Sequence, residues 1–421
     1  MEAGIDTIPL VNDSAKNSLR FHSNNVKNSV ESHSYSLLRW IEQNNYSSFD
    51  HYDYWSSKLG VLGKRLFLKN KLLGSFLVAP IYLLDTYWPA SRKFFAKQSR
   101  SAEAVPRIAS GYFRLYQITQ NSEYIRKGCE LLNWLKENAS KTEHGIGWGL
   151  HFDWKANEFV PKTTPCVTLT AYSTQAFIEG YRLTGRKDYL EIALKTGDFV
   201  FYDLNRKQAG QQTSLSYTPL DHNYVINANS YAAKILVETV SIDNDLEKAD
   251  LIKKVVNYII AQQNADGSWY YSDKNNILQK WNFIDSFHTC FVLQNLFSIW
   301  KWNRDEQLME SICRGYKFFT DNFVTEEFSV RYYYCYPIPT GIITDIRGCA
   351  ETIYCCAFLS EIFPEALDLS VKVTEWTINN MKDKDGFYYF RIYKTHKHKL
   401  PYIRWGQAPM FNALTYLLSK L

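Results

Sequence analysis

The sequence predicts an all-α protein in which six helical hairpins form a closed ring, with aromatic loops gathered at one rim. Three observations support this: a recurring unit of helix, aromatic loop and helix, a constant spacing between units, and a last unit that lacks one helix. Of the 421 residues, 46% are hydrophobic and 16% aromatic, which is ample for a large core. This length could hold two or three domains, but one continuous repeat favours a single one.

The clearest unit lies in the second half of the chain. An amphipathic helix, with Leu251 and Val255 four residues apart, ends at the turn signal before Gly267. After an aromatic and polar stretch, a second helix begins near Asp285, a residue type suited to a helix N-cap. His288 follows three residues later, so we expect it on the same face as the cap, looking back toward the loop.

This unit recurs along the chain from about Arg107 to the C-terminus. Aligning the helices that follow each loop gives steps of 60, 59, 57, 61 and 59 residues, which is typical of a repeat architecture. The residues placed in register are Tyr112, Tyr172, Tyr231, His288, Cys349 and Ala408.

The sixth unit, from Trp405 to Leu421, has one helix only. A closed ring would leave that helix without a partner, so we expect a helix near Ser36–Asn45 to complete the circle. This brings the two ends of the chain together. We therefore predict a flexible leader over residues 1–28 and one ring domain over residues 29–421.

Composition limits the classes of partner. The net charge is +5 with Lys and Arg scattered along the chain, a pattern that disfavours nucleic-acid binding but favours an anionic ligand over a cationic one. The eight cysteines form no CxxC pair, and residues 1–28 contain no apolar signal-peptide core. We expect reduced thiols and a cytoplasmic protein, with a peripheral position at the inner membrane as the alternative.

One long apolar run, Leu72–Leu84, follows the basic string Lys64–Lys71. Its 13 residues are interrupted by Gly74 and Pro80, whereas a membrane-spanning helix needs about 20. We expect this run to be a buried part of the N-terminal region. The alternative is a peripheral membrane contact through residues 64–84.

The loops that precede the second helix of each unit are rich in aromatic and polar side chains, and a ring would open them all at one end. Hydrolysis of a glycosidic bond needs two carboxyl groups, and these loops supply several, although each also suits a helix N-cap. The candidate catalytic residues are Asp153, Asp221, His222, Asp285, His288 and Tyr336. The candidate substrate-binding residues are His151, Trp154, Asn229, Trp281, Asp345, Arg404 and Trp405.

Metal and cofactor sites are not expected. The sequence has no HExxH motif, no Cys/His group with zinc spacing and no EF-hand loop. It also has neither a GxGxxG motif nor a P-loop, which disfavours NAD-dependent and ATP-dependent chemistry.

Helical hairpins with aromatic loops that contain Asp and His resemble the α/α-toroid folds, especially the six-hairpin glycosidases and their polysaccharide-lyase and sugar-epimerase relatives. The segments Phe152–Trp154, Ile284–Thr289 and Arg404–Met410, and Tyr336-Pro337 with Asp345, are similar to toroid proteins found with bacterial surface-polysaccharide genes. This resemblance runs from about Trp148 to the end. It implies an (α/α)6 toroid that processes an oligo- or polysaccharide, and leaves open whether this substrate is acidic or lipid-linked.

The same resemblance leaves the reaction open. Glycoside hydrolysis is the first expectation because paired Asp residues suffice for it. The alternative is proton abstraction at C5 of a uronate, giving epimerisation or elimination, since toroid enzymes of that kind use Tyr and His. A non-catalytic toroid that binds a glycan or a partner is a third reading. Lys254–Trp269 also resembles the repeat of terpene cyclases, but their Asp-rich motifs are missing from the sequence.

Overall fold

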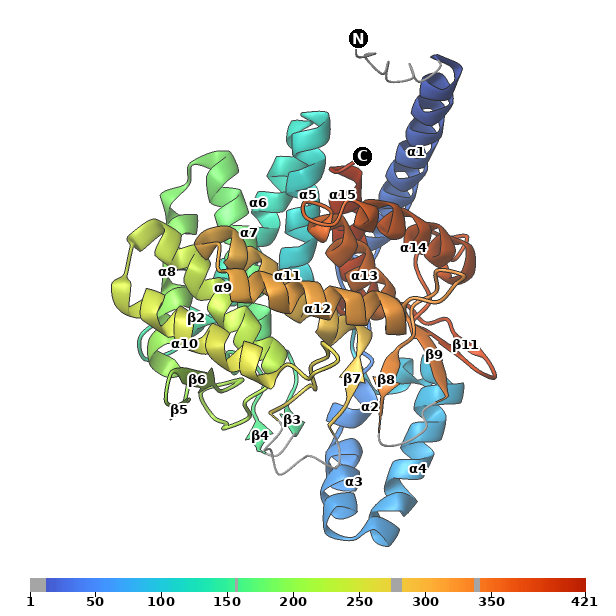
Figure 1. Ribbon diagram of the computed structural model, residues 1–421. Helices are drawn as coiled ribbons and strands as arrows, with labels where there is room; N and C mark the ends of the chain where they lie inside the picture. Colours follow the sequence, from blue (N-terminus) through green and yellow to red (C-terminus); the bar gives the residue numbers. More distant parts are fainter. Residues whose placement is uncertain (1–12, 156–157, 274–281, 337–340) are drawn as a thin grey trace.

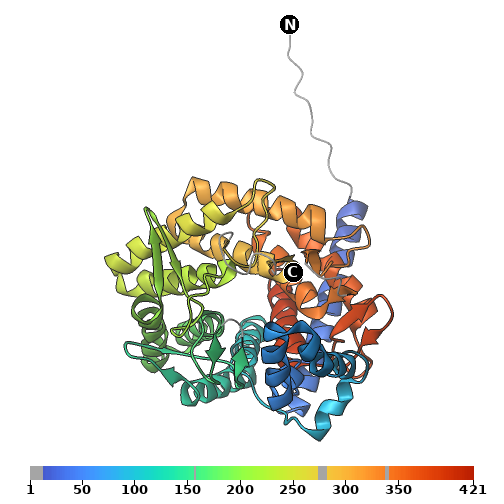
Figure 2. The ribbon, with the colours of Figure 1, turned by 90° about the horizontal axis from the view of Figure 1, so that it is seen from below.

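The structure is a computed structural model that describes residues 13–155, 158–273, 282–336 and 341–421. In this part of the chain, two concentric layers of helices form a ring (Figures 1 and 2). The inner layer consists of α5 (Ala104–Thr119), α7 (Val167–Thr184), α9 (Ile226–Asp243), α11 (Ser286–Asn303), α13 (Ile346–Leu359) and α15 (Ala408–Leu418). The outer layer consists of α6 (Ser122–Glu137), α8 (Lys187–Asp198), α10 (Leu246–Gln262), α12 (Glu306–Phe323), α14 (Glu365–Met381) and α1 (Asp13–Gln43).

The inner layer closes on itself. Each inner helix packs beside the next, and α15 packs beside α5. The first helix, α1, lies against α15 and so supplies the outer helix that the sixth unit lacks. Its buried residues Val30, Leu37 and Ile41 recur at helical spacing and form the face that meets the ring. Because α1 begins at Asp13, the boundary expected at residue 28 falls inside this helix.

The turn from an inner to an outer helix is short and repeats around the ring. Four inner helices end at a left-handed residue, namely Gln120, Gly185, Asn244 and Arg304, with φ between 56° and 70°. A residue in this conformation ends a helix and turns the chain sharply, so the next helix can begin within a few residues. The long loops therefore all lie at the opposite end, where the inner helices begin.

At that end the loops form four antiparallel strand pairs, one three-stranded antiparallel sheet and irregular turns in the described part of the chain. The strands are β1 (Ser140–Lys141), β2 (Ile146–Gly147), β3 (Trp154–Lys155), β4 (Phe159–Val160), β5 (Arg206–Ala209), β6 (Gln212–Leu215), β7 (Ile284–Asp285), β8 (Tyr333–Cys335), β9 (Ile342–Asp345), β10 (Arg391–Tyr393) and β11 (Lys397–His398). Two π-helical turns, η2 (Phe199–Asp203) and η4 (Ile403–Gln407), follow α8 and precede α15.

A repeated hydrogen bond joins each unit to the next. The first N–H of an inner helix or its leading turn donates to an acceptor in the following loop, over 2.8 to 3.1 Å. The last of these bonds reaches the N-terminal segment and closes the circle. The pairs are Val167 to Tyr217, Ile226 to Tyr271, Ser286 to Tyr332, Ile346 to Phe390, and Ile403 to the hydroxyl of Ser48.

These equivalent bonds keep the spacing near sixty residues but correct the register. Tyr172 and Tyr231 both lie five residues after the first bonded N–H, and so do Phe291 and Glu351. His288 and Cys349, which were aligned from the sequence, therefore lie three and two residues too early. From the sequence, the units were aligned at the point where each loop changes into a helix. The polar stretch before that point differs in length from unit to unit, so the aligned positions are not equivalent in the structure.

A helical hairpin projects from the loop end of the ring (Figure 1). It contains α2 (Asp53–Ser56), α3 (Lys58–Lys69), α4 (Lys71–Tyr87) and the 3-10 turn η1 (Pro89–Phe94). The expectation that Leu72–Leu84 is buried is wrong, since Leu72 is 79% exposed and Phe76 is 78% exposed. The run is apolar without being part of the core, because its helix packs on α3 along one face only.

The closing role of α1 leads to a stability prediction. We expect Leu37→Ala to lower the free energy of unfolding by about 2 to 5 kcal/mol, as for other fully buried leucines, because it leaves a cavity between α1 and the ring. Chemical denaturation measures this. Ser32→Ala, on the exposed face of the same helix, should change stability by less than about 0.5 kcal/mol. Equal effects of the two substitutions would contradict a structural role for α1.

Candidate functional site

The loop rim contains a paired aspartate and histidine at the start of α11. Asp285 is the N-cap of this helix, and its Oδ1 accepts the backbone N–H of His288 at 2.8 Å. Its Oδ2 lies 2.7 Å from Nδ1 of the same histidine. The carboxylate is buried, so it orients the ring and holds a proton on Nδ1. The other ring nitrogen, Nε2, then has the free lone pair that a general base needs.

Aromatic side chains surround this histidine and form exposed faces at the rim. The His288 ring lies 4.7 Å from the Tyr271 ring, and Tyr336 stacks on Tyr333 at 4.2 Å. On the other side, Tyr52 stacks on Phe152 at 5.7 Å with nearly parallel rings. Tyr52 and Tyr336 remain 37% and 38% exposed. Such faces suit the apolar side of a sugar ring.

Tyr52, on the second face, lies among charged groups. Burial raises the pKa of Tyr52, Arg404 opposes the rise, and Asp50 adds to it. The rim thus combines aromatic surfaces from the N-terminal segment and from the β8 loop.

A second histidine, His51, lies beneath this rim and was not among the candidates from the sequence. Its ring is 4.3 Å from the ring of Trp405, and its Nδ1 accepts a hydrogen bond from Arg404 at 3.2 Å. Burial lowers the pKa of His51 well below the ordinary value, and the charge of Arg404 lowers it further. The ring is therefore neutral, and its proton lies on Nε2 as a hydrogen-bond donor. The sequence signal was the run Asp50-His-Tyr-Asp53.

Buried ion pairs of alternating sign connect the rim with the centre of the ring. Each of the six side chains is at most 8% exposed, and the three negative charges balance the three positive ones. Arg404 binds Asp50 through two nitrogens, at 2.5 and 2.8 Å. The order along this buried ion-pair chain is Asp50, Arg404, Glu103, Arg347, Glu351 and Arg107.

Arg404 was expected to bind substrate. Its contacts instead place it in the buried ion-pair chain. Burial opposes its charge, but Asp50 and Glu103 outweigh that effect and raise its pKa. Because the guanidinium is buried and paired on both sides, it positions His51 from below.

Two other predicted site residues, Asp221 and Asn229, stabilise the loop before α9 through hydrogen bonds. The carboxylate of Asp221 is fully buried and accepts hydrogen bonds from Tyr217, Thr218 and Asn223 over 2.6 to 3.2 Å. The amide of Asn229, also fully buried, binds the backbone of Leu215 and Val225. Neither side chain has a free polar atom facing the rim, so the geometry assigns both to loop architecture.

Asp345 has a comparable role at the start of α13. It caps Arg347, accepts the indole N–H of Trp405 at 2.8 Å and pairs with Arg391 at 2.5 Å. These bonds leave its buried carboxylate no access to a ligand. They also fix Trp405, half-buried, between His51 and Phe287.

The remaining candidates are placed as follows. Asp153 is exposed and accepts the N–H of Lys162 at 2.7 Å, and His222 is exposed on its loop. Trp154 packs edge-on against Tyr217, and Trp281 lies outside the described residues. His151 is half-buried, and its Nδ1 has no hydrogen-bond partner among the described residues. Burial lowers the pKa of His151, which keeps its ring neutral.

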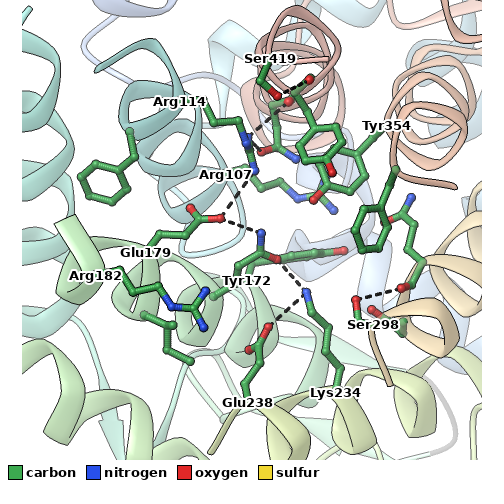
Figure 3. Close-up of a pocket in the computed structure, with 18 of the residues that line it drawn as sticks. Arg107, Arg114, Tyr172, Glu179, Arg182, Lys234, Glu238, Ser298, Tyr354 and Ser419 are labelled. Atoms are coloured by element: carbon green, nitrogen blue, oxygen red, sulfur yellow. Dashed lines mark hydrogen bonds and ion pairs between the residues drawn. The ribbon is translucent and has the colours of Figure 1, made fainter. Parts of the chain in front are cut away.

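A cavity of about 500 Å³ occupies the bore at the opposite end of the ring, where the inner helices end. Figure 3 shows its polar lining. Arg107 and Glu351 lie at its floor, so the buried ion-pair chain separates the cavity from the loop rim. The guanidinium of Arg107 stacks on Tyr172, with 3.9 Å between its Cζ and the ring centroid.

The walls of the cavity contain linked charges. Arg114 lies 3.6 Å from Glu179, which accepts a bond from Gln175 at 2.9 Å. Lys234 binds the same glutamine at 2.7 Å and lies 3.6 Å from Glu238 (Figure 3). Burial raises the pKa of Glu238, with Lys234 opposing and Glu179 adding to the rise. Two half-buried carboxyl groups with different environments therefore face this cavity.

Within the described residues, no three His, Cys, Asp or Glu side chains come together as a metal site. No described helix is both long and apolar enough to cross a membrane.

Comparison with known proteins shows the fold. No protein-family model matches the sequence, and no curated protein matches it. Among solved structures, the chain is similar to cellobiose 2-epimerase from Bacillus thermoamylovorans, with 13% identity, a TM-score of 0.58, and coverage of 76% of this chain and 87% of that one.

Two further structures have other activities on the same architecture. A GH76 α-mannanase from Bacteroides thetaiotaomicron matches with 10% identity and a TM-score of 0.55, over 77% of this chain and 87% of that one. An unsaturated glucuronyl hydrolase specific for heparin matches with 11% identity and a TM-score of 0.56, over 75% of this chain and 85% of that one. Identity at this level shows the fold alone. By its architecture, the chain is an (α/α)6 toroid, the fold that these similar structures share.

Proposed function

We propose that the protein is a glycan-processing enzyme that removes a proton from a sugar carbon next to a carbonyl or carboxyl group. The Asp285–His288 pair at the loop rim is the observation that supports this most directly. In this proposal Nε2 of His288 takes the proton, and the electron pair moves onto the neighbouring carbonyl or carboxyl oxygen. Delivery of a proton from water to the opposite face completes epimerisation, and departure of a neighbouring oxygen substituent, which takes up a proton from water, completes elimination.

The surrounding groups fit this chemistry. The neutral ring of His51 offers its Nε2–H to the oxygen on which negative charge develops. Tyr52 and Tyr336 supply the stacking faces. Similar structures include sugar epimerases, a hydrolase and a polysaccharide lyase, in agreement with a saccharide substrate.

Hydrolysis at the rim, the first expectation from the sequence, receives less support. It needs two carboxyl groups that can reach the substrate. Asp221 and Asp345 are buried and fully hydrogen-bonded, and Asp285 is bound to His288. The carboxyl groups of Glu179 and Glu238 in the bore cavity make hydrolysis at that end the second candidate function.

Incubation with uronate-containing oligosaccharides and neutral disaccharides in heavy water tests the proposal. We expect deuterium at the epimerised carbon, or a new double bond if elimination follows, and both should depend on His288. New reducing ends without deuterium, lost in Glu238→Gln and retained in His288→Ala, would overturn the proposal in favour of hydrolysis in the cavity. Absence of turnover together with measurable glycan binding would overturn it in favour of a binding protein.

A further inference from the structure

The hairpin of α3 and α4 has an unusual concentration of exposed apolar side chains. Of the 21 large hydrophobic side chains that are exposed in the described part of the chain, twelve lie between residues 59 and 95. They include Leu72, Leu73 and Phe76 in the first turns of α4, which are 61% to 79% exposed. The others are Leu59, Leu62, Tyr82, Leu83, Leu84, Tyr87, Trp88, Phe94 and Phe95.

The two helices of the hairpin hold each other through small residues. A Cβ atom at Gly74 would collide with the backbone of Phe67, and one at Gly63 would touch Leu77 and Val78. This close approach directs the larger side chains outward. At the base, Asp85 accepts the indole N–H of Trp55 and pairs with Arg92. Arg92 also donates to the backbone carbonyls of Asp50 and His51, which ties the base of the hairpin to the body of the protein. The apolar outer surface therefore belongs to a hairpin whose two helices pack closely against each other.

The hairpin and the residues that flank it are strongly basic. Residues 54–102 contain nine Lys and Arg residues and one acidic residue, Asp85, which gives a net charge of +8 against +5 for the whole chain. The rest of the protein is thus slightly acidic. Since Asp85 is already paired, the exposed cations have no neutralising carboxylate within their own segment. They are Lys58, Arg65, Lys69, Lys71, Lys93 and Lys97.

Charge and shape together favour a lipid surface over a protein partner. The core of a protein interface is depleted of lysine, whereas an interfacial membrane segment combines apolar side chains with a basic rim. A second copy of the same hairpin would bring two basic surfaces together, which disfavours self-association through this surface. With 17 residues broken by Pro80, α4 can lie in the headgroup region.

We propose that α3 and α4 dock the protein on a bilayer that contains anionic lipids. The hairpin projects from the loop end of the ring, so docking brings the rim toward the lipid surface (Figure 1). Its base is continuous with the rim, because Lys64 of α3 lies 5.1 Å from the ring centroid of Tyr52. A glycan attached to a lipid would reach the rim in this orientation. This last step, a lipid-linked substrate, depends on the proposed function, whereas the docking itself does not.

Co-sedimentation of the full-length protein with vesicles tests the docking. We expect binding to vesicles of phosphatidylcholine and phosphatidylglycerol that is at least tenfold tighter than binding to phosphatidylcholine alone, and that weakens as salt rises. Leu73→Asn combined with Phe76→Asn should weaken binding by tenfold or more, because both side chains are exposed and lose only membrane contacts. Lys69→Glu combined with Lys71→Glu should reduce the preference for anionic vesicles.

Matched controls are available on other parts of the surface. Leu246→Asn changes an 83% exposed leucine at the start of α10, and Lys317→Glu changes a 78% exposed lysine on α12. Both should bind vesicles like the wild type. Loss of binding in the controls, or absence of binding in the wild type, would overturn the proposal. So would a dimer, detected by light scattering, that Phe76→Asn dissociates. None of these measurements uses enzymatic turnover, so they separate docking from the proposed reaction.

Discussion

Replacing His288 with alanine is expected to lower turnover of the sugar substrate by about 10²- to 10⁴-fold, the usual contribution of a general base. The fold should be unaffected, because Asp285 still caps α11 through the backbone N–H of residue 288. The loss should therefore appear in kcat, with an unchanged circular dichroism spectrum at the assay temperature. Deuterium incorporation from heavy water measures the proton-removal step directly.

Two further variants sharpen this result. Asp285→Asn keeps a cap oxygen but places an amide NH₂ or a neutral oxygen beside Nδ1, so the imidazole loses its orienting charge and turnover should also fall. His144→Ala is the matched control, since Nδ1 of His144 lies 2.7 Å from Oδ1 of Asp203 in the same kind of pair on the outer surface. Retained activity in His288→Ala, or equal losses in His288→Ala and His144→Ala, would refute the assignment of His288 as the base.

Removing Asp50 is expected to destabilise the protein by about 3 to 5 kcal/mol, because it leaves the buried ion-pair chain with one uncompensated positive charge. Asp50 supplies two of the hydrogen bonds to Arg404, and the neighbouring Glu103 is already shared with Arg347. Denaturation of Asp50→Ala at neutral pH measures the loss. Asp321→Ala, which breaks the exposed pair with Lys317, should cost less than about 1 kcal/mol.

The pH dependence of this effect has a definite sign. Burial would raise the pKa of Glu103, but Arg347, Arg404 and Arg107 outweigh it and lower the pKa to about 2 from its ordinary value of 4.5. Burial would also raise the pKa of Asp50, but the charge of Arg404 outweighs burial and lowers this pKa. A depressed pKa stabilises the folded state above the ordinary value and loses that contribution as pH falls through the folded value. The wild type should therefore lose stability below about pH 4.5.

A double variant tests whether the buried charge is the cause. At pH 3 the deficit of Asp50→Ala relative to the wild type should be smaller than at pH 7, because the wild type has begun to lose the same contribution. Adding Arg404→Met to Asp50→Ala removes the unpaired charge and should recover part of the stability. A double variant less stable than Asp50→Ala at neutral pH would show that Arg404 acts through packing instead.

The repeat could be read from the sequence because its signals are local. Helical spacing of apolar residues, a turn at Gly267 and a cap at Asp285 each depend on a few neighbouring residues. Repetition of that pattern about every sixty residues implies stacked hairpins, and a missing last helix implies closure by α1. The exact register was not accessible in the same way, since loops of different length precede equivalent positions in α11 and α13.

Candidate site residues were harder to separate from structural ones. His288 was identified because a histidine three residues after a capping aspartate shares its face of the helix. Asp221, Asn229 and Asp345 have equally suggestive positions, yet their side chains satisfy backbone and indole donors in the fold. In sequence, an aspartate or asparagine at a loop end looks the same in both roles. Burial and hydrogen-bond partners distinguish them.

The sequence by itself therefore determined the helical hairpins, their period and the gathering of loops at one end, because short-range periodicity and capping set these features. Tertiary structure alone decided the charged interior of the ring. Arg107 pairs with Glu351, Arg404 with Glu103, and Asp50 with Arg404, across 244, 301 and 354 residues of chain. No local pattern encodes such pairs, since a charged residue finds its partner only after ring closure removes both from water and requires each to be neutralised.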